Sequence, residues 1–148
     1  MLHKHPTFND NRGSFTPFDC KEWEQANVSI NTNKYTFRGM HYQTSPPQIK
    51  YLKVVQGSII DILYDLETKE VKSFHLNTEE AILIEPKYAH GFLTLEDNTI
   101  VTYLVKGEYN PTSEHSIVWK DVDDIKNIVL SNCNESDIVI SEKDSNGK

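Results

Sequence analysis

The chain has 148 residues, a length typical of one domain, and its 15 basic against 22 acidic residues give a net charge of -7. Hydrophobic residues make up 37% of the sequence and aromatic residues 10%, which is enough for a buried core and excludes wholesale disorder. An acidic chain lacks the basic surplus that drives binding to a phosphate backbone, so nucleic acid is not expected as a partner. We therefore expect a single domain over residues 1–148.

The sequence carries no targeting or membrane signal. The N-terminus lacks the apolar run of a signal peptide, and nowhere do about 18 consecutive apolar residues occur. Cys20 and Cys133 lie far apart and form no CxxC pair, so neither a zinc motif nor a redox motif is present. We expect a cytoplasmic protein with free thiols and no membrane partner.

The predicted elements are mostly strands. One or two helical turns are expected first, over residues 19–25. Runs of β-branched and aromatic residues with period-two alternation then predict strands over 51–56, 58–65, 71–76, 81–84, 90–95 and 99–106. A further helical turn is expected over 121–126, and the polar tail 141–148 reads as frayed. The short connections suit antiparallel pairing, so the predicted fold class is all-β, a jelly-roll sandwich or barrel.

Four ionisable residues are candidates for the interior, three of them because they lie in phase with apolar residues of their strands. Tyr103 is in phase with two valines, and His90 is in phase with a phenylalanine and a threonine. Lys50 precedes a leucine and a valine that are in phase with it, and His41 lies in RGMHYQ. Taken singly, each is more often structural: a hydrogen-bonded histidine, a packed tyrosine or a solvated lysine. Together they are the types needed for proton abstraction and return, on strands that a small barrel brings together.

A metal site has poor support from spacing. The sequence His3-Lys4-His5 lies at the extreme N-terminus, and His41 is followed two residues later by Gln43 rather than by a second histidine. A site built from His41, His90 and a carboxylate stays possible without local support. No GxGxxG or P-loop indicates a nucleotide cofactor. We therefore expect neither metal nor organic cofactor.

The chain resembles the nucleotide-sugar epimerases of the dTDP-4-dehydrorhamnose 3,5-epimerase family in segments that follow one another in order: DNRGSF (10–15), QANVS (25–29), FRGMHYQ (37–43), PPQIK (46–50), VVQGSIIDILYDL (54–66), IEPKYAHGF (84–92), TYLVKGEYNP (102–111) and SEKD (141–144). RGMHYQ and AHGF at this spacing are specific, whereas QANVS or SEKD alone is weak. The resemblance implies a cupin-like jelly roll, usually a homodimer, and a cofactor-free epimerase. Such an enzyme inverts carbon 3, and in many members carbon 5, of a nucleotide-linked 4-keto-6-deoxyhexose in deoxysugar biosynthesis for surface polysaccharide such as O-antigen.

The resemblance also implies catalytic roles. It puts the base at His41 and its paired carboxylate at Asp144, an arrangement that fixes the tautomer of the ring and stabilises the imidazolium that forms. Lys50 matches the cation that stabilises the enolate oxygen. Tyr103 matches the acid that returns a proton to the opposite face of the sugar.

The implied binding residues surround this set. His90 is a second donor near the enolate, with Asp65 as its expected orienting carboxylate. Arg38 matches the arginine that pairs with the diphosphate. The other implied contacts to the nucleotide or the pocket fall on Gln25, Asn27, Tyr109, Arg12 and Phe15, the last two commonly across the dimer interface.

Three departures from the family predict an altered or trimmed substrate pocket. Pro17 replaces a usual Glu, which removes an acceptor for the imide N–H of thymine or uracil, so a CDP-linked substrate becomes plausible beside a dTDP-linked one. Glu67 stands where an Arg is usual, before a shorter loop, and the chain stops just past SEKD. A shortened pocket favours inversion at carbon 3 alone.

Two other readings stay open besides the epimerase. A 3,4-ketoisomerase would act on the same substrate class with the same base but a different proton destination. A non-catalytic sugar-binding cupin would keep the fold, although it has no need of a base and an opposed acid. A metal-dependent cupin oxygenase ranks last.

Overall fold

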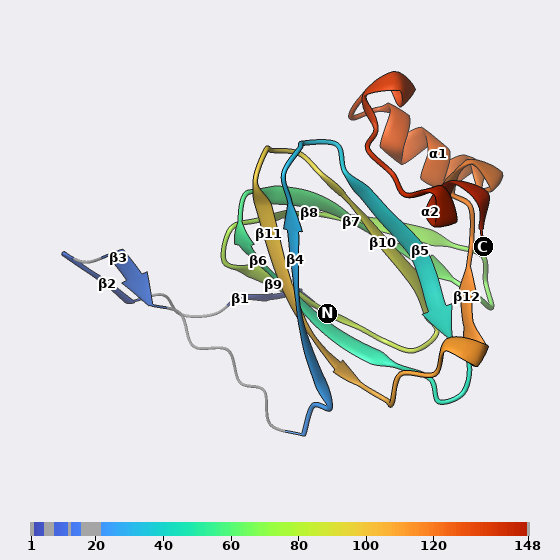
Figure 1. Cartoon of the computed structure of the whole chain (residues 1–148), viewed down its shortest axis with the longest axis horizontal. Coiled ribbons are helices and arrows are strands. Elements are labelled where there is room, and N and C mark those ends of the chain that lie inside the picture. Colours follow the sequence, from blue (N-terminus) through green and yellow to red (C-terminus); the bar gives the residue numbers. More distant parts are fainter. Residues whose placement is uncertain (1, 5–7, 12, 16–21, 148) are drawn as a thin grey trace.

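The computed structural model describes residues 2–4, 8–11, 13–15 and 22–147. Within them, two five-stranded antiparallel sheets pack face to face as a sandwich (Figure 1). The strand order is β1-β9-β6-β11-β4 in the first sheet and β12-β5-β10-β7-β8 in the second, while β2 and β3 pair only with each other. The predicted all-β sandwich of the cupin-like jelly-roll kind is confirmed.

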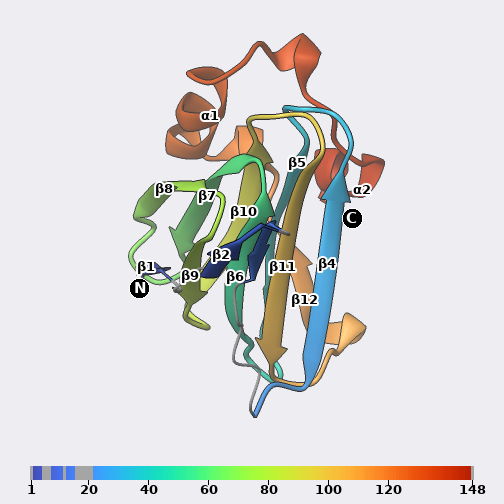
Figure 2. The same ribbon diagram turned by 90° about the vertical axis from the view of Figure 1, so that its left-hand side faces the viewer.

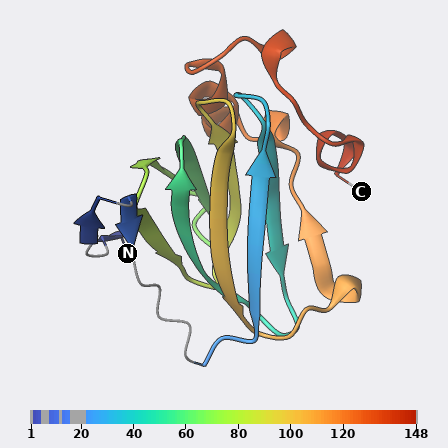
Figure 3. The same ribbon diagram turned by 60° about the vertical axis from the view of Figure 1, so that its left-hand side comes forward.

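The first sheet consists of β1 (Leu2–Lys4), β9 (Glu80–Ile84), β6 (Ile49–Gln56), β11 (Thr99–Lys106) and β4 (Gln25–Asn31). The second consists of β12 (Glu114–Ser116), β5 (Phe37–Gln43), β10 (Tyr88–Thr94), β7 (Ser58–Asp65) and β8 (Val71–Asn77). The separate pair is β2 (Phe8–Asp10) and β3 (Gly13–Phe15), which stands apart from the sandwich in Figures 1 and 3. The helices are α1 (Asp123–Leu130) and α2 (Glu142–Asn146), with short 3₁₀ helices over Pro111–Ser113, Trp119–Asp121 and Glu135–Asp137.

The predicted strands are all found, each with ends within two residues of those expected. The helix expected over 19–25 is wrong in its described part, because Gln25 begins β4 and Glu22 has a φ of 68°, outside the right-handed helical region. Residues 19–21 lie outside the described residues. The expected turn over 121–126 becomes α1, and the tail expected to fray forms α2.

The core consists of two clusters on the two faces of the second sheet. Leu63 lies in the cluster between the sheets, with Leu52 and Val101 of the first sheet. Its neighbour Ile62 lies in the cluster on the other face, together with Ile125 of α1. Ile62 and Leu63 are both fully buried. β7 is therefore apolar on both faces, which explains its nearly continuous hydrophobic run. Figure 2 shows α1 beyond one end of the sheets and α2 close to β5.

No helix in the described ranges has the length and apolarity needed to cross a bilayer.

Candidate active site

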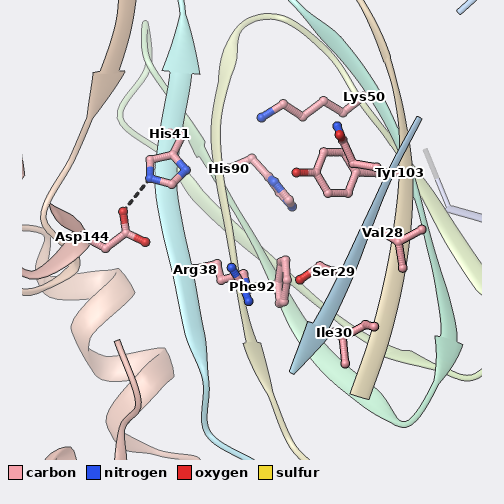
Figure 4. Close-up of a pocket in the computed structure, with 11 residues that line it drawn as sticks. Val28, Ser29, Ile30, Arg38, His41, Lys50, His90, Phe92, Tyr103 and Asp144 are labelled. Carbon is pink, nitrogen blue, oxygen red and sulfur yellow. Dashed lines mark hydrogen bonds and ion pairs between the residues drawn. The ribbon is translucent and has the colours of Figure 1, made fainter. Parts of the chain in front are cut away.

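A cavity of about 330 Å³ opens between the two sheets beside the edge strand β4 (Figure 4). Its lining consists of Asn27, Val28, Ser29, Ile30, Arg38, His41, Lys50, His90, Phe92, Tyr103 and Asp144. These residues come from β4, β5, β6, β10, β11 and α2. The cavity therefore brings together all four residues expected to act in catalysis, His41, Asp144, Lys50 and Tyr103, together with Arg38, His90 and Asn27.

A β-bulge puts two of these residues on one face. His90 of β10 pairs with His41 of β5, and Phe92 pairs with Arg38, so two steps along β10 match three along β5. Strict alternation would put Arg38 and His41 on opposite faces, whereas both line the cavity. Gly39 lies at the bulge with a φ of 127°, and a Cβ on it would come within 2.6 Å of the Gly91 Cα, so only glycine fits there.

His41 and Asp144 form a close pair at the rim of the cavity. The His41 Nε2 lies 2.6 Å from the Asp144 Oδ1, and the Gly39 N–H donates to the Asp144 Oδ2 at 3.1 Å. An ionised carboxylate can only accept, so Nε2 carries the proton and Nδ1 of the neutral ring is left as an acceptor. Burial acts to raise the pKa of Asp144, but the hydrogen bond and charge of His41 and the Gly39 N–H outweigh it and lower that pKa. The pair is thus a carboxylate-supported imidazole able to take a proton.

His90 is held by Asp61, which corrects the expectation for Asp65. The His90 Nε2 lies 2.6 Å from the Asp61 Oδ1, and Asp61 is fully buried. The Asp61 Oδ2 is buried and has no hydrogen-bond partner among the described residues. Asp65 instead accepts the N–H groups of Glu67 and Thr68 in the turn after β7, so its carboxylate is engaged in a loop. One clue to Asp61 was available in the sequence: it is a charge inside an otherwise apolar run, which usually means a specific partner.

Lys50 and Tyr103 point into the cavity from β6 and β11. Figure 4 shows the ammonium and the phenol directed across the cavity toward His90. Burial lowers the pKa of Lys50, opposed by the negative charges of Glu114 and Asp61. Burial raises the pKa of Tyr103, opposed by the positive charge of Arg38 and reinforced by Glu114. The Lys50 amine and the Tyr103 hydroxyl therefore face the same space as the His41 ring. Glu114, whose charge affects both groups, was not among the expected residues.

Some expected contacts lie elsewhere or outside the described residues. Gln25 does not line the cavity, but its Nε2 donates to the Asn27 Oδ1 at 2.9 Å. Tyr109 is 54% exposed and lines a separate polar pocket beside Tyr42. Arg12 and Pro17 lie outside the described residues, as does the side chain of Phe15. For these three residues the sequence-based expectations stay predictions.

Within the described ranges, no group of three or more His, Cys, Asp or Glu side chains could hold a metal ion. The two histidines of the cavity are each paired with a different carboxylate. What the cavity offers is a base, an opposed hydroxyl and two basic side chains, Arg38 and Lys50, which suits proton transfer on an anionic substrate.

Comparison with known proteins gives one family. The family model described as dTDP-4-dehydrorhamnose 3,5-epimerase matches residues 1–148. The chain is 36% identical to the dTDP-4-dehydrorhamnose 3,5-epimerase of Methanothermobacter thermautotrophicus over 84% of its own length and 69% of the relative's. With the enzyme of the same description from Mycobacterium tuberculosis, also 36% identical, the match covers 66% of this chain and about half (52%) of the relative's length.

Solved structures agree with this result along the whole fold. A dTDP-4-dehydrorhamnose 3,5-epimerase from Bacillus anthracis, solved with TDP and PPi bound, superimposes with a TM-score of 0.84 at 28% identity, covering 99% of this chain and 91% of that one. The corresponding protein from Sulfolobus tokodaii gives a TM-score of 0.82 at 30% identity, covering 99% of this chain and 87% of that one.

Proposed function

Because this chain belongs to the dTDP-4-dehydrorhamnose 3,5-epimerase family, we propose that it is an isomerase that epimerises a nucleotide-linked 4-keto-6-deoxyhexose. The single observation that carries this proposal is the His41–Asp144 pair, which faces Lys50 and Tyr103 across one cavity. A binding module needs no base opposed by an acid, so the non-catalytic cupin is the weaker reading.

In the proposed reaction the proton on carbon 3 moves to His41. The carbonyl at carbon 4 acidifies that C–H bond, and its electron pair forms the C3–C4 double bond as the carbonyl becomes an enolate. Lys50 supplies positive charge at the enolate oxygen, with His90 as a second donor backed by the buried Asp61. As the enolate returns to the carbonyl, Tyr103 gives its hydroxyl proton to carbon 3 from the opposite face. Tyr103 then takes a proton from solvent, and His41 releases to solvent the proton that it abstracted. No atom is gained or lost, and the configuration inverts.

The charges around Tyr103 suit this role. Burial raises the pKa of Tyr103, which keeps the hydroxyl protonated at neutral pH. Arg38 opposes that rise and would stabilise the phenolate in the interval before reprotonation. We assign the diphosphate to Arg38, whose planar fork of donors suits phosphate oxygens.

We propose a substrate linked to dTDP or to CDP. The enzyme inverts its sugar at carbon 3, and the second alternative is inversion at both carbon 3 and carbon 5. The TDP bound in the Bacillus anthracis relative supports the thymine nucleotide. The proline at position 17 remains the argument for cytosine. The product would enter deoxysugar biosynthesis for a surface polysaccharide such as O-antigen, in the cytoplasm, with no nucleic acid or membrane partner.

We also propose a homodimer. β4 lies at the edge of the first sheet, and its Val28 and Ile30 are 68% and 65% exposed. An apolar sheet edge is a ready surface for a second chain. The β2–β3 pair, which stands apart from the sandwich and carries the exposed Phe8, adds a second apolar surface. A partner copy would cover both.

Proton exchange tests the activity. The protein is incubated with dTDP-linked and CDP-linked 4-keto-6-deoxyglucose in heavy water, and deuterium at carbons 3 and 5 is read by NMR. We expect deuterium at carbon 3 with wild type and none with His41→Asn. A product whose carbonyl has moved to carbon 3 would indicate the 3,4-ketoisomerase. No exchange with either nucleotide would contradict the enolate mechanism and favour the binding module.

A further inference from the structure

Asn31, at the end of β4, is a buried polar residue that the proposed chemistry does not use. Its side chain is almost inaccessible to solvent, with 2% of the residue exposed. The Asn31 Oδ1 accepts a hydrogen bond from the Arg38 Nε at 2.7 Å. On its other side the Asn31 Nδ2 donates to the Thr99 carbonyl at 3.1 Å. The amide thus connects the guanidinium of Arg38 to the backbone of β11.

This hydrogen bond joins the two sheets at the cavity. β4 and β11 belong to the first sheet, whereas Arg38 lies on β5 of the second. Asn27, Ser29 and Asn31 follow one another at alternate positions of β4, so Asn31 continues the row of polar side chains of which the first two line the cavity. Arg38 is therefore held from across the cavity rather than by its own strand.

The geometry also decides which part of the guanidinium is available. Asn31 engages Nε, and the four remaining N–H groups of an arginine lie on the two Nη atoms. Arg38 is exposed, so its long side chain would otherwise sample several rotamers. Fixing Nε sets the plane of the fork before a ligand arrives, which reduces the entropy lost on binding.

We propose that Asn31 is a positioning residue that orients Arg38 toward the diphosphate of the substrate. This inference rests on the proposed function, which assigns the diphosphate to Arg38. Asn31 does not line the cavity, so we expect it to act on binding of the phosphates and not on proton transfer.

The test compares Asn31→Ala with a matched control, Thr94→Val. Thr94 is also fully buried, and its Oγ1 accepts the Thr36 N–H and donates to the Asn33 carbonyl in the connection between β4 and β5. Both variants remove the hydrogen bonds of a buried side chain at the same end of the sandwich, but only Asn31 contacts Arg38. Calorimetry measures the Kd of each protein for dTDP, CDP and thymidine.

We expect Asn31→Ala to raise the Kd for the diphosphates about tenfold, in line with a lost hydrogen bond to a charged group. Thymidine binding and the kcat of the exchange reaction should change by less than about threefold, and KM should rise with Kd. Thr94→Val should leave all these constants within about twofold of wild type, even where both variants lower the Tm. In an Arg38→Ala background, the Asn31 substitution should have no further effect on the Kd for the diphosphates.

Four outcomes would overturn the inference. If Asn31→Ala binds the diphosphates as tightly as a wild type with normal binding and exchange, the role of Asn31 is excluded. The proposed function is then unaffected. Equal weakening by Thr94→Val, or further weakening by Asn31→Ala without Arg38, would show a general structural effect. Folded wild type that binds neither dTDP nor CDP and shows no exchange would remove the proposed function and this inference together.

Discussion

Asp144 contacts His41 across 103 positions of sequence, and its second oxygen accepts the N–H of Gly39, two residues before that histidine. The carboxylate therefore bonds both the ring and the strand that carries the ring, which prevents it from rotating away. Ser141 caps α2 by accepting the Asp144 N–H, so the helix also holds the backbone of Asp144 in place. The orientation of the proposed base depends on a helix that the sequence pattern alone reads as a frayed tail.

Asp144→Asn should lower kcat for epimerisation by about 100-fold, the lower part of the range for general acid–base catalysis. The amide cannot stabilise an imidazolium by charge, while the cavity keeps its shape, so KM should stay within about threefold. Asp137→Asn, an exposed carboxylate of the same C-terminal segment, is the control and should behave as wild type. Steady-state kinetics measure both variants. Full activity in Asp144→Asn would exclude this carboxylate from the reaction.

The same carboxylate should make stability depend on pH. The pKa of Asp144 is lowered in the folded protein from its ordinary 3.8. Because this pKa is lowered, ionised Asp144 adds fully to the free energy of unfolding above its ordinary pKa of 3.8. That contribution is lost as the pH falls through the lower pKa of the folded protein. The Tm of wild type should therefore exceed that of Asp144→Asn at pH 6, and the difference should shrink below about pH 4. A difference that stays constant from pH 6 to pH 2 would contradict this.

Asp61→Asn and Asp65→Asn should separate orientation from stability. Asp61 bonds the His90 ring, so its amide variant should lower kcat at least about tenfold. Asp65 holds a turn through the N–H groups of Glu67 and Thr68, so its variant should lower the Tm with kcat within about twofold of wild type. Steady-state kinetics and thermal melts of the two variants measure these changes in kcat and Tm. A reversed pattern would restore Asp65 as the residue that orients His90.

Tyr103→Phe should separate proton removal from inversion. His41 can still abstract the proton and exchange it with solvent, so deuterium should enter carbon 3 at a rate within about tenfold of wild type. Without the hydroxyl on the opposite face, His41 returns the deuteron to the side it came from, and formation of the epimer should fall at least about 100-fold. NMR reads both rates in one heavy-water experiment. Equal loss of exchange and inversion would argue against Tyr103 as the separate acid.

Charges on the edge strand should disrupt the proposed homodimer. Val28→Asp combined with Ile30→Asp puts two carboxylates on the exposed surface of β4, where burial against a partner would leave them unpaired. Light scattering after size exclusion should give the mass of one chain for this variant and of two for wild type. Leu130→Asp, on the exposed side of α1, is the control and should stay dimeric. A wild type with the mass of one chain would exclude the dimer.

The strands were predictable from the sequence because their signal is local. Alternation of apolar and polar residues at period two reports which residues of a strand share a face, and it made Tyr103, His90 and Lys50 candidates for the interior without any knowledge of their neighbours. The resemblance then assigned the role of base to His41 and added Asp144. The same local reasoning failed over residues 19–25, where pairing of Gln25 with Val105 of β11 outweighs helical tendency.

Tertiary structure decided which side chains of different strands come together, because the periodicity of a single strand does not contain that information. Arg38 and His41 share a face only because β5 has one residue more than β10 between matched pairs. Asp61 and Asp65 lie in the same phase, two residues on either side of Leu63, the residue opposite His90, so alternation alone leaves both as candidates. The turn after β7 engages Asp65 and leaves Asp61 to the histidine. A side chain's phase follows from its own strand, whereas its partner depends on register, bulges and turns, which form between segments distant in sequence.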